Sequence, residues 1–168
     1  MTPIEQLQSA LGTLGLKAVE ARLEGLLEQA SKKEPSYAEF LQETLSCEVE
    51  ARRTRYLRAR LQLAHLPFGK TFEQFDFGFQ PSIDEKQIRE LRSLRFVHES
   101  SNVVFLGPPG VGKTHLSVAP AEAAIQAGFG AYFVTAHDMV ADLGRAYREG
   151  RLGRRLRVYI APKVLVID

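Results

Sequence analysis

The 168-residue sequence contains one cysteine, two methionines and no tryptophan. The single cysteine, Cys47, cannot form a disulfide within the chain, and its place among helical positions predicts a small buried side chain without a redox role. No apolar run approaches the roughly 18 residues that a membrane-spanning helix needs, and the N-terminus lacks the charged-then-apolar layout of a signal peptide. We therefore expect a cytoplasmic protein with no membrane contact.

Arginine is plentiful and is concentrated in two segments. Residues 52–60 carry five arginines and no acidic residue, and residues 145–157 carry six arginines and one glutamate. Clustered positive charge is typical of proteins that contact phosphate backbones, but a solvated helix face looks the same in sequence, so both interpretations stay open. The candidate DNA-binding residues in these segments are Arg52, Arg53, Arg55, Arg151, Arg154, Arg155 and Arg157.

The first third of the sequence predicts helices. Apolar residues recur at helical spacing from Leu7 to Leu27, and a second helical pattern starts after the break at residues 32–36. Ser36 and Glu39 have the spacing of a capping box, in which each side chain accepts a hydrogen bond from a free backbone amide of the new helix. We therefore assign residues 1–66 to an N-terminal helical region.

The rest of the chain alternates between predicted strands and helices. The predicted strands are 103–106, 131–135 and 164–167, and the predicted helices are one capped by Ser82, one over 113–127, and one that starts with Asp138 as its N-cap. Apolar, β-branched runs of this length suit strands that are covered on both faces. Strands that alternate with helices imply a parallel sheet, so the predicted fold class is α/β.

The sequence GPPGVGKT lies between the first predicted strand and the helix after it, and completes the pattern G-x-x-x-x-G-K-T. Its glycines permit backbone angles that expose successive amides to a β-phosphate, Lys113 reaches the β- and γ-phosphates, and the Thr114 hydroxyl binds Mg²⁺. The loop alone does not distinguish adenine from guanine. The predicted nucleotide-binding residues are Gly107, Pro108, Pro109, Gly110, Val111, Gly112, Lys113, Thr114 and His115.

Asp168 follows the last predicted strand, 55 residues after Lys113. P-loop proteins place at such a strand end the carboxylate that holds Mg²⁺ through water. Thr114 and Asp168 are therefore the predicted magnesium ligands.

Residues 67–81 form a linker that contains Phe72, Phe75, Phe77 and Phe79. A linker with so many aromatic side chains must lie on an apolar surface, so we expect these rings to pack it against the sheet. Contact between the linker and the adenine of a bound nucleotide is the alternative.

The sequence resembles the IstB-like transposition helper ATPases of insertion sequences, relatives of the DnaC helicase loaders in the AAA+ class. The resemblance runs nearly end to end, through FEQFDF, NVVFLGPPGVGKTHL, FVTAHDMV and EGRLGRRLR. It implies a helical region used in DNA contact and assembly, and a three-layer AAA+ core that binds ATP and Mg²⁺. It further implies that the protein forms a homo-oligomer on double-stranded DNA, without sequence preference, and engages a transposase.

By the same resemblance Asp168 is the Walker B aspartate, and the family continues beyond it with a catalytic glutamate, a sensor strand and an arginine finger. We therefore expect residues 82–168 to be the N-terminal part of an AAA+ domain, an incomplete core truncated at Asp168 with impaired ATP hydrolysis. Whether the chain acts as an ATPase stays open. The alternatives to a transposition helper are a replicative helicase loader and a non-catalytic interaction module.

Overall fold

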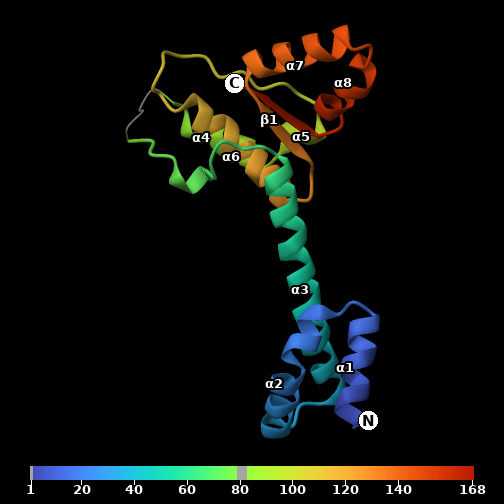
Figure 1. The fold of residues 1–168 in the computed structure, drawn as a ribbon. Coiled ribbons are helices and arrows are strands. Elements are labelled where there is room, and N and C mark those ends of the chain that lie inside the picture. Colours follow the sequence, from blue (N-terminus) through green and yellow to red (C-terminus); the bar gives the residue numbers. More distant parts are fainter. Residues whose placement is uncertain (1, 79–82) are drawn as a thin grey trace. The chain divides into compact units, whose positions relative to one another are not determined.

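The computed structural model describes residues 2–78 and 83–168 (Figure 1). The chain divides into two compact units, unit 1 from Met1 to Tyr56 and unit 2 from Leu57 to Asp168. The division falls inside the helix α3, Tyr37–Leu63. The domain boundaries that we placed after residues 66 and 81 stay predictions.

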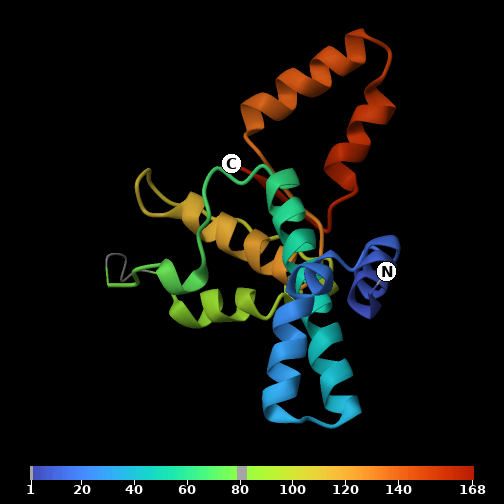
Figure 2. The same cartoon turned by 60° about the horizontal axis from the view of Figure 1, so that its bottom comes forward.

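Unit 1 contains α1, Pro3–Thr13, α2, Lys17–Lys33, and the first part of α3. In this unit α2 and α3 run side by side as a helical hairpin (Figure 2). The predicted capping box at the start of α3 is confirmed, because the Ser36 amide donates to the Glu39 carboxylate at 2.8 Å and the Glu39 amide donates to the Ser36 hydroxyl at 3.3 Å.

A buried carboxylate joins the two helices of this hairpin. Glu48 of α3 accepts hydrogen bonds from the backbone amide of Ala18, in the first turn of α2, at 2.8 Å, and from the guanidinium groups of Arg52 at 3.1 Å and Arg55 at 3.0 Å. Burial by itself would raise the pKa of Glu48, but these hydrogen bonds outweigh burial and lower the pKa below its ordinary value. Glu48 thus caps α2, whose own N-cap residue, Leu16, provides no side-chain bond.

We predict that Glu48→Ala lowers the midpoint of thermal unfolding, because the Ala18 amide and two arginines lose their acceptor. Since the folded-state pKa is below the ordinary 4.5, the stabilisation is present above that pH and is lost as the pH falls through the lowered pKa. Circular dichroism of the full chain between pH 3 and pH 7 measures both effects. Glu50→Ala, which removes an exposed acid from the same helix, is the control. Equal midpoints for the two variants at neutral pH would contradict the role given to Glu48.

Unit 2 begins with the last residues of α3. Its further elements are η1, Phe72–Gln74, α4, Glu85–Arg92, α5, Arg95–His98, α6, Lys113–Gln126, β1, Ala131–Val134, α7, Ala136–Arg148, α8, Leu152–Ile160, and β2, Val164–Ile167. Ser82, the predicted cap of the first helix after the linker, lies outside the described residues, and so does Phe79. The N-cap of α4 is Asp84, whose carboxylate accepts from the Lys86 amide at 2.8 Å.

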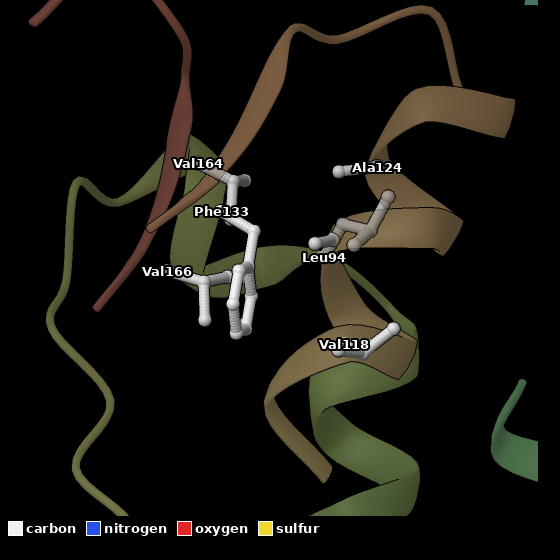
Figure 3. Packing of buried hydrophobic residues seen from close by; sticks show 7 residues of the cluster. Leu94, Val118, Ala124, Phe133, Val164 and Val166 are labelled. Carbon is white, nitrogen blue, oxygen red and sulfur yellow. The ribbon is translucent and has the colours of Figure 1, made fainter. Parts of the chain in front are cut away.

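The strands β1 and β2 pair in parallel, with Ala131 opposite Val164 and Val134 opposite Ile167. One face of the pair packs on α6, where Phe133 lies among the side chains shown in Figure 3. On the other face, the ring of Tyr132 meets the ring of Tyr159 of α8 edge to face, with centroids 5.7 Å apart. The predicted α/β class with parallel strands is therefore confirmed, since helices cover both faces of the pair.

Two predictions about local structure are wrong. No strand forms at residues 103–106, because a ladder needs a neighbouring strand and neither β1 nor β2 pairs with this segment. Val104 and Leu106 in this segment are 74% and 90% exposed. Asp138 is not the N-cap of α7; the cap is Thr135, whose hydroxyl accepts from the Asp138 amide at 3.0 Å.

Across residues 2–78 and 83–168, no helix is both long and apolar enough to cross a bilayer.

Candidate functional site

The glycine-rich loop of residues 107–114 leads directly into the N-terminus of α6. Gly110 and Gly112 adopt left-handed backbone angles, with φ of +84° and +87°, which favour glycine. Gly112 is the N-cap of α6, and its carbonyl accepts the first hydrogen bond of the helix, from the Leu116 amide at 3.0 Å. Free amides and the positive end of the helix dipole meet here, so the loop is suited to bind an anion.

Lys113 extends back along this loop. Its ammonium group donates to the carbonyl oxygens of Gly107 at 2.9 Å and Pro108 at 2.7 Å. Within the described part of the chain, no carboxylate forms an ion pair with Lys113. The charge of this side chain is therefore balanced by neutral carbonyls only, and is available to a phosphate. Pro109 is exposed, while Val111 packs near Gly107.

The two predicted magnesium ligands are in contact. The hydroxyl of Thr114 lies 3.1 Å and 3.0 Å from the two carboxylate oxygens of Asp168. The backbone of Asp168 is held in turn, because its amide donates to Val134 and its carbonyl accepts from Ala136. A hydroxyl and a carboxylate are the hard oxygen ligands that Mg²⁺ prefers, so the residues present fit this metal.

A cavity of about 550 Å³ opens beside the loop. Its size is in the range of small-molecule sites. Apolar side chains from α4 and α6 line it together with polar groups, among them Ile88, Leu91, Leu116, Gln87 and Ser101. Gly107, Pro108, Val111 and Lys113 border the same cavity, so it is continuous with the loop.

His115 faces the linker and not the loop. Its Nε2 lies 3.0 Å from the carbonyl oxygen of Thr71, and its ring meets the ring of Phe75 edge to face at 5.2 Å. The expected packing of the linker against the sheet is wrong, since Phe72 is buried in a cluster with residues of α4 and α6, and Phe75 and Phe77 pack against that cluster. A contact between the linker and adenine stays a prediction.

The predicted DNA-binding arginines of α8 fall into two groups. The guanidinium of Arg155 forms an ion pair with Asp142 of α7, and Arg151 forms one with Glu149. Arg154 and Arg157 are exposed, and neither forms an ion pair with a described residue. Their charge is therefore free to meet an outside partner.

The arginines of α3 divide in the same way. Arg52 and Arg55 are the partners of Glu48, although each side chain is still more than half exposed. Arg53 is exposed and forms no ion pair within the described residues. Of the three, Arg53 is therefore the arginine whose charge is most available to an outside partner.

Asp142 and Tyr159 were not found from the sequence. The Tyr159 hydroxyl donates to the Asp142 carboxylate at 2.5 Å, and this bond, together with the bond from Arg155, lowers the pKa of Asp142 below its usual value. Burial and the neighbouring Asp142 raise the pKa of Tyr159 to about 12. No local signal marks these residues, because they are far apart in sequence and meet only when α7 and α8 pack together.

A parallel α/β unit whose phosphate loop meets a strand-end carboxylate defines a P-loop nucleotide-binding protein. The chain matches the family described as IstB-like ATP binding protein over residues 9–168, and it belongs to that family. It is 43% identical over 164 residues to a protein of Geobacillus stearothermophilus described as an ATP-binding protein of insertion sequence IS5376. It is 45% identical over 165 residues to the corresponding IS21 protein of Pseudomonas aeruginosa. Each alignment covers 98% of this chain, which spans 65% and 62% of the two relatives.

We predict that Arg155→Ala lowers the thermal stability of the chain, whereas Arg154→Ala leaves it unchanged, because Arg155 forms an ion pair with Asp142 of α7 and Arg154 forms none with a described residue. Because the pKa of Asp142 is lowered, its contribution is present above the ordinary value of 3.8 and is lost as the pH falls through the lowered pKa. The difference in unfolding midpoint between Arg155→Ala and the wild type should therefore become smaller at acidic pH. Thermal unfolding from pH 2.5 to pH 7 tests this, and a gap that stays constant would contradict the assignment.

Proposed function

We propose that this chain binds ATP with Mg²⁺ and serves as a helper protein in the transposition of an insertion sequence. The observation that carries the proposal is the contact between the Thr114 hydroxyl and the Asp168 carboxylate at the mouth of a complete phosphate loop. The names of the relatives support ATP as the nucleotide and an insertion sequence as the setting.

Each part of the site has a role in this proposal. The loop amides and the N-terminus of α6 hold the β-phosphate, and Lys113 exchanges its carbonyl partners for phosphate oxygens. The Thr114 hydroxyl and the Asp168 carboxylate would hold Mg²⁺, which when bound would neutralise phosphate charge. The cavity beside the loop accommodates the base and ribose.

We predict that Lys113→Ala weakens binding of ATP with Mg²⁺ by about 10- to 100-fold, because a charge-assisted contact to phosphate is lost. Isothermal titration calorimetry with the full chain measures this. Lys163→Ala, which removes an exposed lysine elsewhere in unit 2, is the control and should bind like the wild type. Equal affinities for the wild type and Lys113→Ala would refute the nucleotide site. Asp168→Asn should remove most of the difference between titrations with Mg²⁺ and with EDTA.

DNA is the second partner in the proposal, bound without sequence preference through Arg53, Arg154 and Arg157, which form no ion pair with a described residue. On α8 these are Arg154 and Arg157, whereas Arg155 already forms an ion pair with Asp142. Arginines that neutralise phosphates release counterions, so such binding weakens as salt rises. A transposase is the proposed protein partner, because the relatives are named for insertion sequences.

We predict that replacing Arg154 and Arg157 together by alanine reduces the slope of log K against log salt by up to about two phosphate contacts. Fluorescence anisotropy with a labelled duplex, measured over a range of salt concentrations, gives the slope. In the matched control, Arg89 and Arg95 are replaced by alanine. This removes the same amount of charge, but these two arginines are paired with Glu85 and Glu99. A slope that changes equally in both double variants, or in neither, would assign Arg154 and Arg157 to a solvated helix face.

A further inference from the structure

Residues 70–77, here called the strap, lie along one stripe of α6. The far end of the strap is fixed where the amide of Lys70 donates to the Glu122 carboxylate at 3.1 Å, and its middle is fixed by the buried ring of Phe72. The strap contacts positions of α6 that recur every three or four residues and so share one helix face, namely Gly112, His115, Leu116, Ala119 and Glu122.

The near end of the strap lies on the last glycine of the phosphate loop. A Cβ atom added to Gly112 would stand 2.9 Å from Cε2 of Phe75, so the ring already fills the space that a side chain would need. The same ring meets His115 edge to face. The carbonyl oxygen of Thr71 only accepts, so the Nε2 of His115 must carry the hydrogen of their 3.0 Å bond.

His115 follows Lys113 and Thr114 in the first turn of α6. The three side chains leave the helix about 100° apart in succession, so they point in different directions but move together when the turn rotates. Lys113 and Thr114 point to the loop and to Asp168, while His115 points to the strap. A bond that fixes the orientation of His115 therefore also fixes that of the two site residues.

We propose that His115, clasped by Thr71 and Phe75, is a positioning residue for the phosphate site, and that it does not contact the nucleotide. The functional consequence of this proposal rests on the proposed nucleotide binding. The contacts of His115 with Thr71 and Phe75, here called the clasp, do not depend on any ligand. The hydrogen bond of His115 is directed to Thr71 of the strap, and its ring meets the ring of Phe75 edge to face. Through His115 the orientation of the first turn of α6 depends on a segment about forty residues earlier in the sequence.

The test compares His115→Ala, which removes the clasp, with His115→Gln, whose amide can still donate to the Thr71 carbonyl. Glu122→Ala releases only the far end of the strap, two turns along α6, and is the control for lost stability. Amide hydrogen exchange of residues 107–118 is measured on the nucleotide-free chain, and ATP with Mg²⁺ is then titrated into each variant by calorimetry.

We expect faster exchange at the start of α6 and about fivefold weaker ATP binding for His115→Ala, with both restored to within about twofold by His115→Gln. Glu122→Ala should unfold at a lower temperature but bind ATP within about twofold of the wild type. Unchanged exchange in His115→Ala would overturn the clasp. Faster exchange with unchanged affinity, or an affinity loss matched by Glu122→Ala, would overturn the positioning role. A wild type that does not bind ATP would refute the proposed function, while the exchange measurement would still decide the clasp.

Discussion

Asp168 reaches Thr114 because β2 pairs in parallel with β1, so that both strands end at the same edge of the sheet. The pairing also holds the backbone of Asp168 through the hydrogen bonds to Val134 and Ala136. A carboxylate on a loose segment would sample many positions and would hold a metal poorly. The short parallel pair therefore does more than cover apolar surface, because it sets the distance between a carboxylate and a hydroxyl that are 54 residues apart.

The helix α6 connects this pair to everything else in the site. One of its faces packs on β1 and β2 through Val118 and Ala124 (Figure 3). Another face receives the strap, and the N-terminus of the helix carries the phosphate loop. Because these functions belong to one helix, a change on one face can be transmitted to the others. The strap and the sheet thus hold α6 from two sides, which fixes the first turn where Lys113 and Thr114 lie.

Sequence patterns were sufficient wherever a motif is local. The approach of Asp168 to Thr114, across 54 residues, was expected from the pattern of P-loop proteins. Local spacing and hydrophobic runs predicted the capping box of Ser36, the glycine-rich loop, β1 and β2. They failed where the outcome depends on a distant partner. The apolar run at 103–106 has strand composition, yet no described strand pairs with it, and the aromatic linker has no periodicity that selects α6 over the sheet. His115 stands in the loop motif, but only folding shows that it faces the strap.

The arginine clusters show the same limit when function is predicted from sequence. A run of arginines in the sequence gives the local charge, but it does not tell how much of that charge is neutralised by acidic residues of the folded chain. The charge that is not neutralised determines how strongly a DNA phosphate is attracted. Glu48 forms ion pairs with two arginines of α3 but neutralises only one of their two charges, and Asp142 neutralises Arg155 of α8. The ion pair between Asp142 and Arg155 joins α7 to α8, whereas the Glu48 pairs lie within α3 and orient the carboxylate that caps α2. Removing any of these arginines therefore alters stability as well as charge. Because Arg53, Arg154 and Arg157 lack such partners among the described residues, their replacement changes mainly the electrostatic potential that DNA would meet.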